Sequence, residues 1–209
     1  VRIAGTLTDF NPENYVSPKD IKKMDPFIHY GMAAGIQAVE DSGLDVTDDI
    51  AHRVGVAVGS GIGGLPGIEK GTHLMMEGGP RKISPFYVPS NIINMISGHL
   101  SIKYGARGPN FAIVTACSTG THNIGDAARL IEHGDADVMI AGGAEMSTSP
   151  TGLAGFANAR ALSTNNDDPQ GASRPFDRGE DPETAAVSDE PIWDTRAIFA
   201  RGFARSGAG

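Results

Sequence analysis

Apolar residues recur along the chain in two spacings, one typical of helices and one of buried strands. Between residues 26 and 42 they return every three to four positions, which predicts a helix with one buried stripe. The stripe consists of Ile28, Met32, Ile36 and Val39. Asp25 is a suitable N-cap, Pro26 suits the first helical position, and Gly43 follows the last periodic residue. The sequence therefore predicts a helix over residues 26–42.

Three short runs are apolar at nearly every position, as strands buried on both faces are. They cover residues 54–58, 111–116 and 136–141, and the last two flank a helical segment at 118–133 that ends before Gly134. Strand, helix and strand in this order make a parallel crossover. The fold class is therefore α/β, with helices covering both faces of the sheet.

The segment between the first two runs is harder to assign. Residues 65–90 contain four prolines and only a weak helical stretch at 68–77, so we expect a long excursion over the surface. Ser90 is then expected to cap a helix that runs to Tyr104, with Gly105 past its end. The residues expected to face inward on it are Ile92, Ile93, Ile96 and Leu100.

Composition and charge exclude several classes of protein. The 209 residues carry a formal charge of −8, which argues against general affinity for nucleic acid or an anionic membrane. No apolar run approaches the roughly 20 residues that a membrane-spanning helix needs. The single cysteine excludes a disulfide framework, makes the cytoplasm the default location, and with scattered histidines predicts no metal site.

The two ends of the chain differ from its middle. Residue 1 is Val1 rather than methionine, so we expect the sequence to begin within a longer reading frame. Towards the other end the chain is rich in acidic residues and proline and has no sustained periodicity. We expect residues 178–209 to form a divergent, poorly ordered tail.

Cys117 stands where an apolar run meets the following helix. Free N–H groups at a helix start favour a thiolate, and a sharp strand-to-helix turn exposes its side chain, so Cys117 is a candidate nucleophile. The alternative is a small buried hydrophobic residue. No base can be assigned from spacing, and we expect His122, one turn later, to be structural or solvated.

Two further patterns leave alternatives open. Residues 59–64 match G-x-G-x-x-G after a strand, which suggests dinucleotide binding, but Pro66 and Gly67 are expected to interrupt the required helix. A glycine loop that packs closely or leaves room for a ligand fits better. Lys19, Lys22 and Lys23 form either a solvated face or a docking patch for an acidic partner.

Four separated motifs together resemble the β-ketoacyl-acyl-carrier-protein synthases. They are Arg-Lys-Ile-Ser-Pro-Phe at 81–86, Thr-Ala-Cys-Ser-Thr-Gly at 115–120, Gly-Asp-Ala-Asp-Val-Met-Ile-Ala-Gly-Gly-Ala-Glu at 134–145, and Ser-Arg-Pro-Phe-Asp at 173–177. The stretch from residue 4 to 177 is similar to the type II elongating enzymes of fatty acid synthesis. Four motifs in the family's order are far more specific than any one of them.

The resemblance implies a thiolase-like fold, of which residues 1–177 form part of the N-terminal half. The family's first strand and its C-terminal half are absent from this sequence. The resemblance also implies a homodimer that takes its substrates on the phosphopantetheine of acyl carrier protein and needs no other cofactor. Cys117 would accept the acyl chain, and decarboxylation of malonyl carrier protein would supply the carbanion that extends it.

The resemblance assigns roles residue by residue. Cys117 is the nucleophile and its own N–H is one oxyanion donor. Ile62 and Phe156 line the acyl pocket, and Tyr87 reaches the pocket of the dimer mate. The cations that face the carrier protein are Lys19, Lys22, Lys23, Arg81 and Arg160.

The same resemblance places the family's catalytic histidines in its second half, so we expect these 209 residues alone to be inactive in condensation. The alternative is a non-catalytic remnant or subunit that dimerises and binds carrier protein. Retention of Cys117 argues against that alternative, since such a role needs no thiol.

Overall fold

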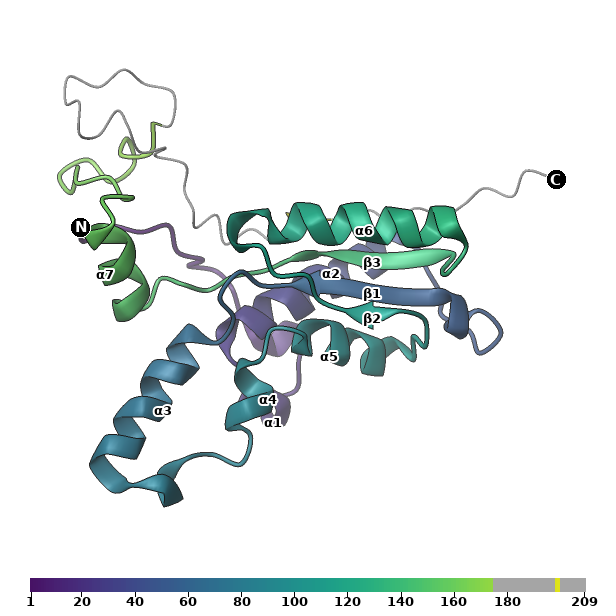
Figure 1. Ribbon diagram of the computed structural model, residues 1–209, viewed down its shortest axis with the longest axis horizontal. Coiled ribbons are helices and arrows are strands. Elements are labelled where there is room, and N and C mark those ends of the chain that lie inside the picture. The colour runs from purple at the N-terminus through teal and green to yellow at the C-terminus, as the bar shows by residue number, and fades with distance from the viewer. Residues whose placement is uncertain (175–197, 200–209) are drawn as a thin grey trace.

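A four-stranded mixed sheet forms the centre of the computed structural model, which describes residues 1–174 and the backbone of residues 198–199 (Figure 1). The strands are β1 (Val54–Gly59), β2 (Asn110–Phe111), β3 (Val138–Gly143) and β4 (Ile198–Phe199). Their order is β2-β1-β3-β4; β2 and β3 run parallel to β1, and β4 runs antiparallel to β3. The predicted α/β class is confirmed.

Helix α2 (Pro26–Ser42) begins and ends where the sequence predicts. The Asp25 carboxylate accepts a hydrogen bond from the Phe27 N–H at 3.4 Å, and Gly43 adopts a φ of 66° that ends the helix. The predicted stripe of Ile28, Met32, Ile36 and Val39 is buried. Local spacing and capping therefore account for this helix.

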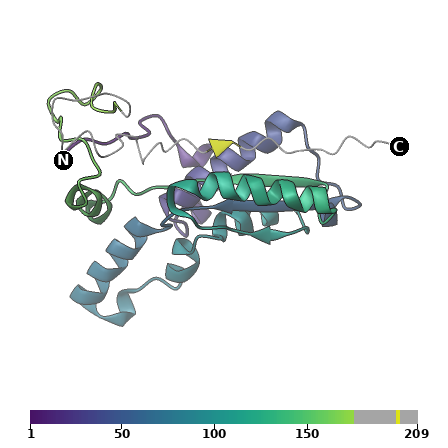
Figure 2. The same ribbon diagram turned by 45° about the horizontal axis from the view of Figure 1, so that its top comes forward.

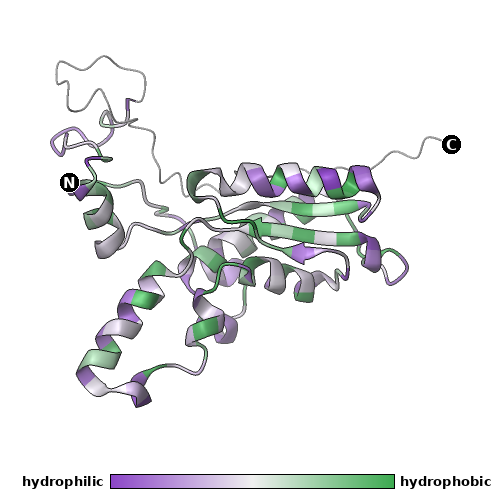
Figure 3. Ribbon diagram, in the orientation of Figure 1, coloured by the Kyte–Doolittle hydropathy of each residue, from purple (hydrophilic) through white to green (hydrophobic). Residues whose placement is uncertain are grey.

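Two hydrophobic cores lie on opposite faces of the sheet, because successive β1 side chains point to opposite sides. Val56 and Val58 pack with α2 and α5 (Met95–Tyr104), whereas Ala57 packs with α6 (Thr119–His133). Figures 1 and 2 show α6 alone on one face and α2 with α5 on the other, and Figure 3 shows hydrophobic residues along both β1 and β3. Coverage of both faces by helices is as predicted.

The predicted strand at 111–116 is wrong beyond Phe111. Only Asn110 and Phe111 pair with β1, and the next residues turn towards α6 instead. The Ile113 N–H donates to the Asn123 side chain at 3.0 Å, and the Thr115 N–H donates to the Thr119 hydroxyl at 2.9 Å. Side chains of α6 thus take the backbone hydrogen bonds that a strand partner would otherwise supply.

The single helix expected between Ser90 and Tyr104 is two helices, α4 (Tyr87–Asn91) and α5. Ser90 is not a cap, because it lies within α4 and its hydroxyl donates to the Tyr87 carbonyl. Ile92 has extended backbone, which separates the two helices, and its side chain is exposed rather than inward-facing. Ile96 and Leu100 are fully buried, and Gly105 ends α5 with a φ of 69°, as predicted.

Helix α3 (Leu65–Gly78) is longer than the weak pattern at 68–77 suggests. Pro66 and Gly67 lie in its first turn and do not interrupt it, since a proline there lacks only an N–H that would be unpaired anyway. With α4 and the 3-10 turn η3 (Pro80–Lys82), α3 forms an arm that projects from the body (Figure 1).

Shorter elements complete the described chain. They are η1 (Pro12–Asn14), α1 (Pro18–Ile21), η2 (Ala51–Arg53), η4 (Ala116–Ser118) and α7 (Pro150–Asn158). None of the helices in residues 1–174 is both long enough and apolar enough to cross a bilayer. Apart from β4, the predicted tail at 178–209 lies outside the described residues.

Candidate active site

Cys117 occupies a sharp corner between β2 and α6. It is the central residue of η4, the 3-10 turn that directly precedes α6, and its side chain is exposed. The preceding Ala116 has a φ of 51°, a left-handed conformation that is uncommon for residues other than glycine. The exposed thiol contradicts the alternative of a small buried hydrophobic residue, and the corner has the predicted position.

Asn123 and Thr119 hold this corner against the sheet. Asn123 is fully buried; it accepts from the Ile113 N–H at 3.0 Å and donates to the Ile113 and Thr119 carbonyls at 3.0 and 2.8 Å. The Thr119 hydroxyl accepts from the Thr115 N–H at 2.9 Å. Three of these hydrogen bonds, all from the first turn of α6, therefore fix the segment that leads to Cys117.

His122 lies beside the corner but bonds elsewhere. Its Nδ1 is 2.6 Å from the Thr115 hydroxyl, and its ring is exposed. This agrees with the structural or solvated role expected for it. Within residues 1–174 no side chain hydrogen-bonds the Cys117 thiol, so these residues offer no general base in contact with it.

The glycine loop at residues 59–64 packs against the same corner. A side chain at Gly61 would place its Cβ 3.0 Å from the Ala116 carbonyl oxygen and 2.9 Å from Glu145 Oε2. One at Gly59 would meet the Ile113 carbonyl oxygen at 2.5 Å. Protein atoms fill the space around these glycines, which supports close packing over the dinucleotide alternative.

Glu145 and Ser60 are site residues that the sequence reasoning did not single out. Glu145 lies just after β3 and accepts hydrogen bonds from the Ser60 hydroxyl at 2.9 Å and the Ile62 N–H at 2.7 Å. Ser60 in turn accepts from the Gly63 N–H at 3.2 Å. The sequence signal that could have identified Glu145 is its position at the end of an apolar strand. A carboxylate that is partly buried there needs hydrogen-bond donors where the chain leaves the sheet.

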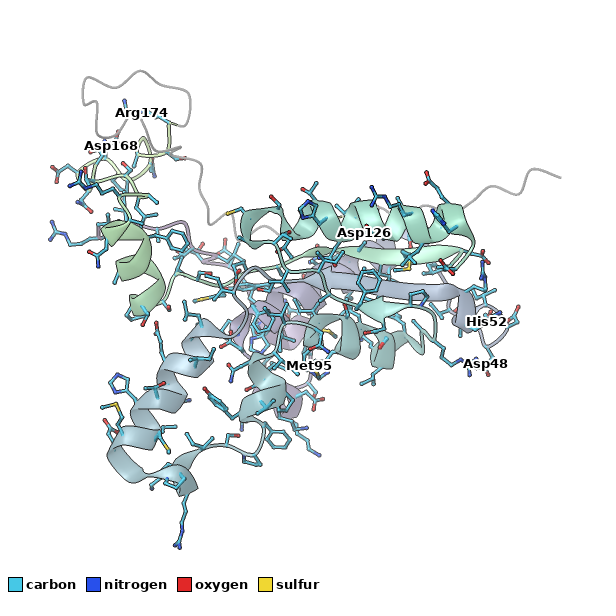
Figure 4. All side chains as sticks on the ribbon, viewed as in Figure 1. Asp48, His52, Met95, Asp126, Asp168 and Arg174 are labelled. Carbon is cyan, nitrogen blue, oxygen red and sulfur yellow. The ribbon has the colours of Figure 1, made fainter. Side chains whose placement is uncertain are left out.

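All these groups lie beyond the carboxyl ends of β1 and β3, where open α/β sheets bind their ligands. The opposite end carries exposed ion pairs, such as Arg107 with Asp48 at 3.2 Å and Arg53 with Asp137 at 2.7 Å. Figure 4 shows Asp48 at that end, far from the arm formed by α3 and α4. The candidate site therefore lies at the end that holds Cys117.

The predicted acyl-pocket residues lie in three different places. Ile62 is on the glycine loop next to the Cys117 corner and is 38% exposed. Phe156 is half-buried on α7, and the Tyr87 ring packs on Gly71 of α3. The structure thus brings Ile62 near Cys117, but within one chain it does not bring Tyr87 there.

Tyr87 instead lines a cavity of about 260 Å³ between α3, α4 and the start of α2. Burial raises the pKa of Asp25 in its wall to about 6, assisted by the charge of Glu145 and opposed by hydrogen bonds from Gly67 and Phe27. Cys117 is not among the lining residues. This cavity is separate from the thiol.

The predicted docking cations form one group and one outlier. Lys23 pairs with Asp20 at 2.8 Å and lies 5.5 Å from the centre of the Phe86 ring. Lys22 lines the same cavity as Phe86, and Lys19 lies just before it on α1. Arg81 belongs to η3 itself, and all of these cations except the half-buried Lys23 are exposed. Arg160 follows α7, which Figure 1 shows well apart from α1.

The described residues contain no group of three or more histidine, cysteine, aspartate or glutamate side chains that could hold a metal ion. The only described thiol, Cys117, belongs to no such group. The exposed thiol of Cys117 on its fixed corner offers the chemistry of a nucleophile.

Curated relatives share most of the chain. A 3-oxoacyl-[acyl-carrier-protein] synthase 2 from Vibrio harveyi is 62% identical over 180 residues, which are 86% of this chain and 43% of that protein. Proteins of the same name from Coxiella burnetii and Staphylococcus aureus are 57% and 48% identical, and each match covers 44% of the relative. The chain thus spans less than half the length of the curated relatives it matches.

Solved structures share the fold. A type II PKS ketosynthase, solved with its acyl-carrier protein and bound to the hexaketide, is 30% identical with a TM-score of 0.72, over 76% of this chain and 46% of that one. A β-ketoacyl synthase from Burkholderia phymatum is 29% identical with a TM-score of 0.73, and the match covers 83% of this chain and 43% of that one. The predicted thiolase-like fold, in its N-terminal part, is confirmed.

The family model for the β-ketoacyl synthase N-terminal domain matches residues 6–181, which is most of the sequence. The match contains the Cys117 corner, the glycine loop and Glu145. The chain therefore belongs to the β-ketoacyl synthase family.

Proposed function

We propose that this chain supplies the nucleophilic half of a 3-oxoacyl-acyl-carrier-protein synthase. The Cys117 thiolate attacks the thioester carbonyl of an acyl carrier protein, the phosphopantetheine leaves as a thiolate that takes a proton from water, and the acyl group remains on Cys117. A malonyl carrier protein then loses carbon dioxide, and its carbanion attacks the new thioester. The Cys117 thiolate is released, and the product is a 3-oxoacyl chain two carbons longer.

One observation carries this proposal: the only cysteine of the chain is exposed on a fixed corner beyond the carboxyl ends of the parallel strands. The names of the relatives support the acyl substrate and its carrier. The Cys117 N–H is proposed as one oxyanion donor, and no cofactor is required besides the carrier's phosphopantetheine. Ile62 and Phe156 are proposed to line the path of the acyl chain.

The partners are proposed on charge and position. Lys19, Lys22, Lys23 and Arg81 present positive charge on a chain whose net charge is −8, which suits an acidic carrier protein. Arg160 is proposed as a further contact. Because Tyr87 lies away from Cys117 in its own chain, it is proposed to reach the site of a second copy in a cytoplasmic homodimer.

Condensation is proposed to need residues beyond these 209. Decarboxylation builds carbanion and enolate charge that hydrogen-bond donors must stabilise, and in residues 1–174 no side chain hydrogen-bonds the Cys117 thiol. The isolated 209-residue polypeptide is therefore proposed to take up an acyl group without extending it.

The test uses this polypeptide with octanoyl acyl carrier protein. Intact-mass measurement is expected to show one octanoyl group on Cys117, none in Cys117→Ala, and no 3-oxoacyl product when malonyl carrier protein is added. Absence of the adduct in a folded protein would refute the proposal. Binding of carrier protein without any adduct would favour instead the non-catalytic, carrier-binding subunit. The exposed lysines are the observation that supports this second candidate.

A further inference from the structure

We propose that Glu145 is a positioning residue that clamps the glycine loop against the Cys117 corner and so keeps a path open for long acyl chains. This inference rests on the proposed function, because it assigns Glu145 a role in the access of acyl groups to Cys117. The glycine loop, residues 59–64, begins at the last residue of β1 and ends directly before α3.

The Glu145 carboxylate holds this loop at two points. Oε1 accepts from the Ser60 hydroxyl at 2.9 Å, and Oε2 accepts from the Ile62 N–H at 2.7 Å, both within the range of good hydrogen bonds. Ser60 is buried and Glu145 half-buried, so the bonds are partly shielded from water. Oε1 also accepts from the Met146 N–H at 3.3 Å, which fixes the carboxylate itself.

The loop meets the corner at Gly61. A Cβ added at Gly61 would lie 2.9 Å from Glu145 Oε2 and 3.0 Å from the Ala116 carbonyl oxygen. Gly61 therefore sits between the carboxylate and the residue that directly precedes Cys117. A shift of the loop away from Glu145 must move it relative to the thiol.

The loop has little intrinsic stiffness, because it contains Gly61, Gly63 and Gly64. Gly63 has a φ of 83°, and its N–H donates to the Ser60 hydroxyl that Glu145 holds. Without the carboxylate, the Ile62 side chain, 38% exposed, is free to move over the thiol. A small reagent would pass it, whereas a long chain would have to displace it.

The experiment compares two alkylating reagents with the same electrophile, iodoacetamide and N-dodecyl iodoacetamide. Because the chain has one cysteine, each rate constant reports on Cys117 alone. We expect Glu145→Ala to lower the ratio of the dodecyl rate to the iodoacetamide rate at least fivefold. Glu145→Gln should stay within twofold of wild type, since its amide oxygen can still accept from the Ile62 N–H.

Two further variants make the result specific. Glu132→Gln removes one charge from the exposed face of α6 and should leave the ratio unchanged. Ser60→Ala removes one arm of the clamp and should lower the ratio in the same direction, which keeps the test decisive where Glu145→Ala does not fold. An unchanged or higher ratio in the folded variants, or an equal fall in Glu145→Ala and Glu145→Gln, would overturn the clamp.

Octanoyl transfer from carrier protein is measured separately on wild type. Failure of octanoyl transfer together with the expected alkylation-rate ratios would refute the proposed function and support the role of Glu145. Octanoyl transfer with alkylation-rate ratios unchanged in the variants would support the proposed function and refute the role of Glu145.

Discussion

Asn123→Ala is expected to destabilise the chain strongly, because Asn123 supplies the hydrogen bonds that replace a strand partner before Cys117. The fully buried side chain makes three bonds of 2.8–3.0 Å, two of them to Ile113. Its removal leaves the Ile113 N–H and C=O unpaired at about 1–2 kcal/mol each, so the free energy of unfolding should fall by about 3 kcal/mol. For a chain of this size that corresponds to a melting temperature roughly 6–12 °C lower.

Urea unfolding followed by circular dichroism gives the free energy, and a thermal melt gives the temperature. Asn123→Asp should be nearly as damaging, since it sets a second acceptor against the Ile113 and Thr119 carbonyls. Asn158→Ala, at an exposed site on α7, is the matched control and should change stability by less than about 0.5 kcal/mol. A loss below about 1 kcal/mol in Asn123→Ala would refute the role given to this side chain.

Three further predictions concern other parts of the molecule. Burial raises the pKa of Asp25 to about 6, so the folded chain is more stable with Asp25 neutral than with Asp25 ionised. As the pH rises from about 4 to above 6, the free energy of unfolding of the wild type relative to Asp25→Asn should therefore fall by roughly 2–3 kcal/mol. Urea unfolding at several pH values measures this difference, and an increase with pH would contradict the prediction. Gly35→Val places a Cβ 2.5 Å from Leu100, so it should lower the free energy of unfolding by roughly 1–3 kcal/mol. In a double-mutant cycle, Leu100→Ala should recover part of that loss, because it removes the atoms that the new side chain meets. Strictly additive losses would count against the contact. Lys22→Glu should slow octanoylation of Cys117 by carrier protein roughly fivefold or more at low salt. The rate at which iodoacetamide alkylates Cys117 should stay unchanged. Equal octanoylation rates in the variant and the wild type would remove Lys22 from the docking surface.

The sequence was sufficient where local rules decide the structure. Helix α2 needed only its spacing, the Asp25 cap and Gly43, and the end of α6 needed only Gly134 with its φ of 84°. The position of Cys117 at a strand-to-helix corner also followed from adjacent apolar and helical patterns.

The sequence was insufficient where distant residues compete for the same backbone. The apolar run after Phe111 has the composition of a strand, yet the Asn123 side chain makes the hydrogen bonds to its backbone at Ile113. No local sequence pattern predicts this contact. Glu145 and Ser60 are 85 positions apart and meet only because β1 and β3 pair directly. Such contacts depend on strand order, which spacing along one chain does not encode.

The two faces of the sheet differ in their tolerance of sequence change. On the face of α2 and α5, large side chains such as Ile96 and Leu100 can exchange volume with their neighbours. The α6 face is built largely from alanines, and a Cβ at Gly143 would lie 3.2 Å from the Gly120 Cα, so an added methyl group there has backbone as its neighbour. Relief would come from lifting α6, whose first turn holds the segment that leads to Cys117. Random mutagenesis should therefore find variants that fold but lose thiol chemistry mainly on the α6 face, while the opposite face yields variants that differ in stability alone.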